Sequence, residues 1–400
     1  MRNYKRLSGN IVFSLLLIGI IFFSGCWDAK ELANLALVSA IGIDLDEKHP
    51  RHVLVTIQII KPGEIKSASA GGDSSGGAEG KPSTSKKQPY LMVSSSGETV
   101  SEVFRNFVYQ VNRELYFADN QIIVFGKEAA RKGVLPYLDY FMRTREPREN
   151  VWILVAEGKA KEILETNFGL EKIPANEINQ LIINRGMASQ AGAATQEEFL
   201  SRLMSKASAN YTSFIQVIGT TEKKKISLVG TAVFKGDKLV GEFDKKETRG
   251  LLWVINKVKR GNITVKSAGG IFNLDILRAG SKMVPEIQSE EVRIKITVNV
   301  EYGLTGETKS EDLTNLHFIE TIEVLAGRTI RGEIKAALRK AFLFNTDVFG
   351  FGEAIHRKFP KEWKIMKPVW DQQFLATNVS IKINSRLRSI GFSVKPLIPK

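Results

Sequence analysis

Short apolar runs alternate with helical patterns over the first third of the chain. Runs bounded by polar turns predict strands over 38–44, 53–60, 121–125 and 151–155. Between them, apolar residues from Val100 to Leu115 recur at the i, i+3, i+4, i+7 spacing of an amphipathic helix. Further helical patterns cover 127–142 and 159–165. Because strand, helix and strand follow one another, this part is expected to have α/β character with crossover connections.

Irregular sequence over 174–194 separates this part from a strand-rich middle section. A helix is expected next, over 196–207. The segments 227–234 and 238–243 then face each other across Lys235-Gly236-Asp237, which is a typical hairpin signal. Two further segments, 250–256 and 263–266, are interpreted as extended.

The last third changes its pattern again. Apolar and polar residues alternate over 292–302 and over 376–387, as in strands that bury one face. Between them lie a long helical pattern over 321–342 and a second helix over 352–358, which ends before Pro360. This order predicts an α+β module with its helices on one face of the sheet.

These changes predict an α+β fold of three dissimilar domains, with mixed and antiparallel sheets and packed helices. We expect an N-terminal α/β domain over 26–192, a strand-rich middle domain over 193–284 and a C-terminal α+β domain over 285–400. The segment 62–89 is rich in Gly, Ser and Lys and has no apolar core of its own. We therefore expect a flexible loop there.

The first 25 residues have the composition of an export signal. Arg2, Lys5 and Arg6 precede an apolar stretch over 11–23. That stretch is too short to span roughly 30 Å of hydrocarbon comfortably. Residues 1–25 are therefore predicted to be a signal peptide.

Cys26, the only cysteine of the chain, follows this leader directly. Ser24 and Gly25 are small, as a signal peptidase requires, and the Cys26 thiol could then carry a diacylglycerol. The alternative is an uncleaved anchor in which Cys26 is an ordinary buried residue. Phe23 is a departure from the usual lipoprotein signal, which has leucine at that position.

The formal net charge of the chain is +14, which falls to about +11 without the leader. The basic residues are scattered, the longest run being 223–225, and export would separate the protein from nucleic acid. Anionic lipid therefore explains the charge better than nucleic acid does, since each basic residue near such a surface adds roughly 1 kcal/mol of attraction. An ordinary solvated surface is the other explanation left open.

Candidate chemistry is sparse. The four histidines are His49, His52, His317 and His356, and no carboxylate or cysteine follows the first two at zinc-ligand spacing. Hydrolase and phosphate-binding motifs do not occur, and the pair Gly350 and Gly352 follows no predicted strand. We therefore expect no enzyme, no cofactor and no metal site.

Several segments together resemble the Ger(x)C family, the lipoprotein C-subunits of spore germinant receptors. The resemblance extends over nearly the whole mature chain and rests on the order of the segments 25–28 with 31–32, 40–44, 230–241 with 247–251, and 347–352 with 359–363. The segment 62–89 looks like an insertion specific to this member.

The resemblance implies a lipoprotein on the outer face of the spore inner membrane, with Cys26 as its S-diacylglycerol and N-palmitoyl cysteine. It also implies assembly with two integral membrane subunits into a receptor that responds to nutrients, and an elongated fold of three mixed α/β domains. It implies no catalytic residues.

Two other functions share the exported leader. A solute-binding lipoprotein of an import system would have two similar α/β lobes, whereas this chain changes character from third to third. An anchored hydrolase would need a catalytic constellation, and the sequence offers none. The fold can distinguish a solute-binding lipoprotein from a receptor subunit. Two similar lobes joined by a hinge favour solute binding, whereas unlike domains favour a receptor subunit.

Overall fold

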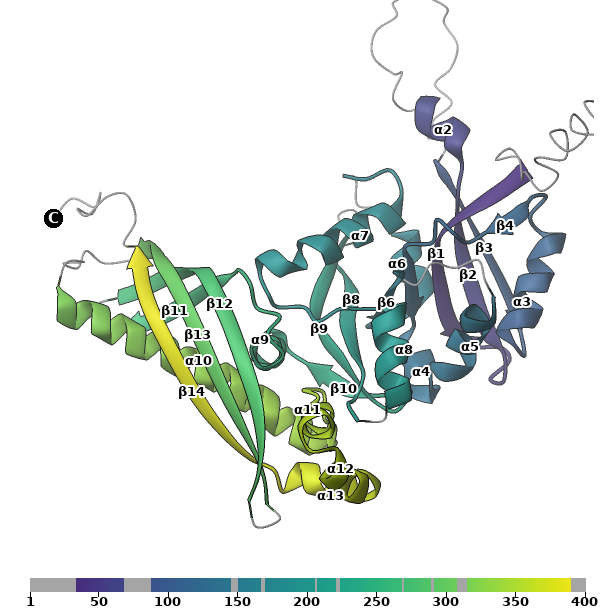
Figure 1. Ribbon diagram of the computed structural model, residues 1–400. Helices are drawn as coiled ribbons and strands as arrows, with labels where there is room; N and C mark the ends of the chain where they lie inside the picture. Colours follow the sequence, from purple (N-terminus) through teal and green to yellow (C-terminus); the bar gives the residue numbers. More distant parts are fainter. Residues whose placement is uncertain are drawn as a thin grey trace, which may run out of the picture.

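The computed structural model describes residues 34–67, 88–144, 150–166, 170–205, 207–220, 224–267, 270–288, 291–307 and 315–389. Its strands form two sheets, one of ten strands and one of four, which lie in different halves of the molecule (Figure 1). Helices pack on both sheets, so the expected α+β fold with mixed sheets is confirmed.

The ten-stranded sheet has a parallel centre and antiparallel flanks. Its main order is β10-β9-β8-β6-β5-β1-β2-β3, while β4 pairs with β1 and β7 with β6. β1, β5, β6 and β8 run parallel to one another. The strands are β1 (Leu35–Leu45), β2 (Val53–Ile60), β3 (Tyr90–Gly97), β4 (Glu114–Tyr116), β5 (Ile122–Phe125), β6 (Trp152–Ala156), β7 (Ala194–Thr195), β8 (Tyr211–Ile218), β9 (Lys225–Lys235) and β10 (Lys238–Phe243).

Helices cover both faces of this sheet, which is why its central strands are buried along almost their whole length. On one face pack α3 (Val100–Asn106), α4 (Lys127–Lys132), α5 (Leu135–Arg143) and α8 (Gln196–Ser205). On the other pack α6 (Ala160–Glu165) and α7 (Pro174–Asn184). The short 3-10 helices η2 (Phe107–Tyr109) and η3 (Arg185–Met187) follow α3 and α7.

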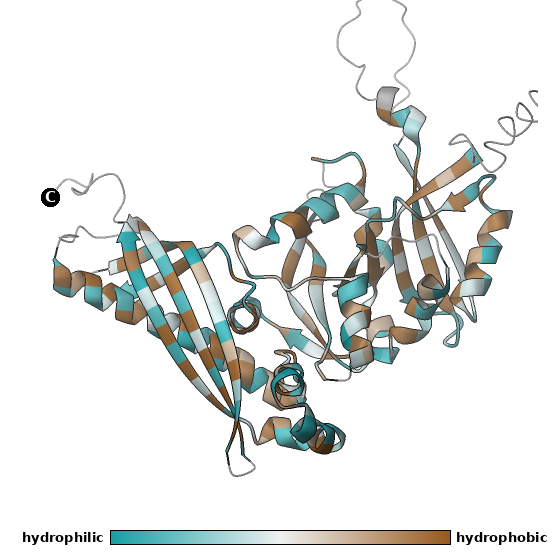
Figure 2. Ribbon diagram, in the orientation of Figure 1, coloured by the Kyte–Doolittle hydropathy of each residue, from teal (hydrophilic) through white to brown (hydrophobic). Residues whose placement is uncertain are grey.

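The four-stranded sheet has the order β11-β12-β13-β14 and packs one face on the long helix α10 (Leu316–Phe344) (Figure 1). Its strands alternate apolar and polar residues, which Figure 2 shows as bands of colour. β13 and β14 are parallel, so the helices between them form a crossover. The strands are β11 (Asn262–Ser267), β12 (Gly270–Gln288), β13 (Glu291–Glu307) and β14 (Asn378–Ser389).

Further helices lie where the two halves meet. α9 (Lys245–Val254) lies between the sheets and contacts α10, β9 and β12. After α10 come the short helices α11 (Phe351–Lys358), α12 (Pro360–Met366), η4 (Lys367–Val369) and α13 (Trp370–Leu375), at one end of the four-stranded sheet (Figure 1).

Several helices differ from the sequence-based expectations: α12 and α13 were not expected, and the helix expected over 127–142 is divided into α4 and α5. The irregular sequence of 174–194 contains the helix α7, which buries Ile178 and Ile182. The extended interpretation of 250–256 was wrong, because α9 covers Lys245–Val254. The expected helix over 100–115 ends as α3 and η2 at Tyr109, and its last residues begin β4.

The strands of the expected middle domain, 193–284, are divided between the two sheets. β8 pairs in parallel with β6, so β7 to β10 extend the ten-stranded sheet, while β11 and β12 belong to the other. Of the expected loop over 62–89, Pro62–Ser67 form the short helix α2, and 68–87 lie outside the described residues. The predicted signal peptide and Cys26 also lie outside them.

Candidate functional site at the junction of the two sheets

The segments that resemble the Ger(x)C family lie at two places among the described residues. Residues 40–44 belong to β1, in the centre of the ten-stranded sheet. The others, within 230–251 and 347–363, meet where β9, β10 and α9 approach α10 to α13. The segment around Cys26 is outside the described residues, so the structure gives that residue no position.

Asp44, at the end of the first of these segments, holds the beginning of α6. It is 4 % exposed, and its two carboxylate oxygens accept hydrogen bonds from the backbone N–H groups of Ala160 (2.8 Å) and Lys161 (3.0 Å). Burial raises the pKa of Asp44, and the two N–H donors oppose that effect. Because no α6 residue caps the helix by its own side chain, Asp44 has a structural role.

Glycines allow the elements at the junction to approach closely. A Cβ atom on Gly250 of α9 would lie 2.1 Å from the carbonyl oxygen of Glu333, and one on Gly352 of α11 would lie 2.5 Å from that of Ala207. These distances are shorter than any van der Waals contact, so the backbones can pack this closely only because both residues lack a side chain. The glycines in these segments therefore determine how the two halves pack.

Asp347 organises the start of α11 from a fully enclosed position. Its carboxylate accepts hydrogen bonds from the backbone N–H groups of Phe351 (3.0 Å) and Gly352 (2.8 Å) and from the indole N–H of Trp370 (3.3 Å). Burial raises the pKa of Asp347 to about 6, although these donors favour the charged form. One carboxylate thus joins the end of α10, the start of α11 and α13.

The raised pKa of Asp347 predicts a pH-dependent contribution to stability. The folded state holds this proton more tightly than the unfolded chain, in which the pKa is near 3.8. Stability is therefore contributed below that pH and lost as the pH rises through about 6. The quantity to compare is the free energy of unfolding of the wild type minus that of Asp347→Asn. We expect this difference to fall by roughly 3 kcal/mol as the pH is raised from about 3.5 to 7.

Urea denaturation of both proteins at several pH values measures this difference. The control is Asp139→Asn, because Arg143 lowers the pKa of the exposed Asp139 and no such fall is expected there. The prediction would be contradicted if the difference in free energy of unfolding between the wild type and Asp347→Asn stayed constant with pH.

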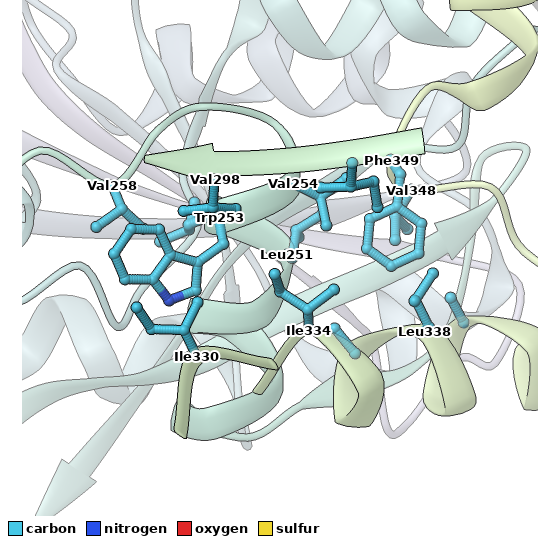
Figure 3. Close-up of a cluster of buried hydrophobic side chains, with 14 of the residues drawn as sticks. Leu251, Trp253, Val254, Val258, Val298, Ile330, Ile334, Leu338, Val348 and Phe349 are labelled. Carbon is cyan, nitrogen blue, oxygen red and sulfur yellow. The ribbon is translucent and has the colours of Figure 1, made fainter. Parts of the chain in front are cut away.

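A buried ion pair connects α9 to α10 at the same junction. Glu333 is 3 % exposed and is paired with the Arg249 guanidinium, whose Nε lies 2.9 Å from Glu333 Oε2. The same oxygen accepts a hydrogen bond from Trp253 Nε1 at 2.9 Å. Figure 3 shows the apolar surroundings, with the Trp253 indole beside Ile330 of α10. This arrangement fixes the position of α9 against α10.

Two of the histidines, His49 and His52, lie beside a carboxylate in an arrangement that could hold a metal ion, which the sequence did not suggest. Asp46, which precedes His49 and His52, brings one ligand atom within 4.8 Å of theirs. Because Asp46 precedes the two histidines, a metal-ligand motif in which the carboxylate follows them does not include Asp46. However, Asp46 already accepts hydrogen bonds from Ser96 Oγ (2.5 Å) and Lys48 N (2.9 Å), which hold its pKa well below the usual range. These contacts hold the turn between β1 and β2 in place and join it to Ser96 of β3.

In the part of the chain that the structure describes, no helix has the length and apolarity needed to cross a bilayer.

Comparisons with known proteins agree with the resemblance. A family model described as the spore germination protein N-terminal domain matches residues 28–218. A second, described as spore germination B3/GerAC like, C-terminal, matches residues 229–391. The chain belongs to the Ger(x)C family of spore germination proteins. The two models meet between β8 and β9, inside the ten-stranded sheet, so the boundary between them is not a boundary between the two sheets.

Relatives match over almost their full length. This Ger(x)C protein is 28 % identical to spore germination protein KC of Bacillus subtilis over 406 residues, covering 96 % of each chain. It is 22 % identical to spore germination protein B3 of the same organism, covering 95 % of this chain and 97 % of the relative. The crystal structure of the GerBC protein matches with a TM-score of 0.53 at 17 % identity, covering 87 % of this chain and 96 % of the other, which supports the fold.

Proposed function

We propose that this Ger(x)C protein is a lipid-anchored, non-enzymatic subunit of a nutrient germinant receptor. It would lie on the outer face of the spore inner membrane and assemble there with two integral membrane subunits. The observation that carries the proposal is the family match, which begins at residue 28, just after Cys26, and extends to residue 391. An anchor at Cys26 would thus leave the whole matched region outside the membrane.

The end of the molecule at which β1 begins has a surface suited to lie against a membrane. β1 begins at Leu35, nine residues after Cys26, and nine residues reach at most about 30 Å. β4 pairs in parallel with the start of β1, so the turn before β4 lies at this same end. Val108 of the 3-10 helix η2 lines the same hollow as Asn34, next to the start of β1. Val108 is 74 % and Tyr109 is 89 % exposed. An exposed aliphatic and aromatic pair near two acyl chains is typical of an interfacial contact.

The unlike architecture of the two halves supports the receptor subunit over the import alternative. A solute-binding lipoprotein would have two similar lobes, whereas here a ten-stranded mixed sheet stands beside a four-stranded sheet with a long helix. The carboxylates enclosed at the junction, Asp347 and Glu333, are engaged in a helix start and an ion pair rather than in a catalytic arrangement. This supports a role in assembly.

Affinity purification of the tagged protein from spore membranes tests the proposal. After mild detergent extraction, mass spectrometry is expected to find two multi-spanning membrane proteins in amounts comparable with the tagged chain. An unrelated tagged lipoprotein from the same membranes serves as the control. Recovery of a transport permease and its ATPase instead would favour the import alternative and contradict the receptor role.

A further inference from the structure

A cavity of about 450 Å³ lies at the junction, between the β9–β10 hairpin and the end of α10. Its lining comes from both halves of the molecule, with Arg202 and Asn210 on one side and Thr346 and Trp370 on the other. Its volume falls within the range of small-molecule sites in proteins, roughly 300–1,000 Å³.

Buried polar atoms without a hydrogen-bond partner are concentrated in the residues that line this cavity. Ten such side-chain atoms occur among the described residues, and five of them belong to the lining: Arg202 Nη1, Asn210 Nδ2, Asn210 Oδ1, Asn345 Oδ1 and Thr346 Oγ1. Asn210 is 1 % exposed and Thr346 is 3 % exposed. Leaving a buried polar group unpaired costs about 1–3 kcal/mol, so a molecule in the cavity that paired with these groups would be stabilised by them.

The lining carries three carboxylates, Asp237, Asp347 and Asp371, and two cations, Arg202 and Lys235, so a partner is indicated by which of these charges is left unpaired. Each lining carboxylate is already engaged: Asp347 by backbone N–H groups, Asp237 by Leu135 N (3.3 Å) and Asp371 by Lys235 (2.8 Å). Arg202 differs, since no carboxylate among the described residues pairs with it. Its contacts are with Tyr211, whose ring centroid lies 4.1 Å from Cζ and whose hydroxyl lies 3.1 Å from Nη2. A partly buried guanidinium with a free N–H is a typical binding group for a carboxylate.

We propose that this cavity binds a small molecule that bears a carboxylate. Arg202 Nη1 and Asn210 Nδ2 supply hydrogen-bond donors for the carboxylate. Asn210 Oδ1, Asn345 Oδ1 and Thr346 Oγ1 can accept from an N–H or O–H group of the same molecule. The ligand would contact residues of both halves and so stabilise their junction. The site is formed by this chain alone and depends on neither the lipid anchor nor the membrane subunits.

Thermal unfolding of the purified full chain in detergent, at constant ionic strength, tests the proposal. The probes are sodium acetate, which carries only the carboxylate, and glycine, which adds an ammonium group. Ethylammonium chloride is the matched probe without a carboxylate. Because a ligand that binds only the folded state raises its stability, we expect both carboxylate probes to raise the unfolding midpoint along a one-site saturation curve. Ethylammonium should have no such effect.

Two substitutions locate the response. Arg202→Met is expected to weaken the acetate affinity at least tenfold, and Asn210→Asp, which places a negative charge in the cavity, is expected to abolish the response. Arg185→Met is the control, because the Arg185 guanidinium stacks on Trp152 at 4.7 Å outside the cavity, and it should retain the affinity within twofold. Circular dichroism verifies the fold, and if one cavity variant fails to fold the other decides.

Either of two outcomes would overturn the proposal. The first is a midpoint of the wild-type chain that shows no saturable response to either carboxylate, which would mean that water alone fills the cavity. The second is a saturable response that every folded cavity variant keeps unchanged, because binding would then occur elsewhere on the chain.

Discussion

Cys26→Ala is expected to abolish acylation of this Ger(x)C protein completely. The chain contains one cysteine, so the variant has no thiol left to which a diacylglycerol could be attached. Without that modification the leader should remain uncleaved, and an unlipidated precursor should accumulate. Since two acyl chains give stable membrane attachment whereas one gives only marginal attachment, the loss is also expected to weaken assembly with the membrane subunits.

Metabolic labelling with a fatty-acid analogue measures the acylation, and gel mobility distinguishes precursor from mature chain. The matched control is Ser24→Ala, which keeps a small residue before the cysteine and should be labelled like the wild type. Incorporation of label into Cys26→Ala at the wild-type level would show that Cys26 is not the acylated residue. If labelling is lost but co-purification of the membrane subunits is unchanged, the anchor is not needed for assembly.

The sequence predicted best those elements whose side chains face one apolar and one polar environment. β13 and β14 alternate strictly because one face packs on α10 while the other faces solvent. β12 lacks this regularity: its pairing with β13 shifts at two places, between Asn273 and Leu274 and between Ile276 and Arg278. The first shift skips Thr305 of β13 and the second skips Leu277 of β12, so β12 buries alternate residues only up to Ile276 and loses that alternation beyond Leu277.

α9 was taken for an extended segment because Leu251, Leu252, Trp253 and Val254 are consecutive apolar residues, and all four are buried. A helix that lies between two sheets is covered on several sides, so the one-sided period of a surface helix disappears. The signal that could have identified it is the capping box. Asp244 accepts a hydrogen bond from Glu247 N at 2.7 Å, and Glu247 accepts one from Asp244 N at 2.9 Å.

The site at the junction was largely beyond sequence reasoning. Asp347, Trp370 and Asn210 are far apart along the chain, and only the packing of α10 and α11 against the β9–β10 hairpin brings them together. The sequence did single out the segments that contain Gly250 and Asp347. Gly250 allows a close backbone approach and Asp347 accepts hydrogen bonds from backbone N–H groups, and catalytic motifs describe neither of these roles. Cys26 lies outside the described residues, and its lipidation stays a prediction that rests on the local sequence around it.

Glu333→Ala is expected to lower the free energy of unfolding by about 3–5 kcal/mol, the usual cost of removing one partner of a buried ion pair. The substitution would leave the Arg249 guanidinium without its counter-charge and the Trp253 indole N–H without its acceptor. Arg249 would keep only its hydrogen bond to the carbonyl oxygen of Asn262 (2.7 Å). Since these groups lie between α9 and α10, the loss should act on the packing of the two halves.

Equilibrium denaturation in urea measures the effect on the full chain in detergent. Glu301→Ala provides the matched control, because Glu301 also pairs with an arginine, Arg388 at 2.7 Å, but does so at the surface. Removing that exposed pair should cost less than about 1 kcal/mol. Equal losses for the two variants would contradict the prediction, because the larger cost depends on burial rather than on the ion pair itself. Glu333→Gln, which keeps an acceptor for Trp253, is expected to fall between them, and this would separate the charge contribution from the hydrogen-bond contribution.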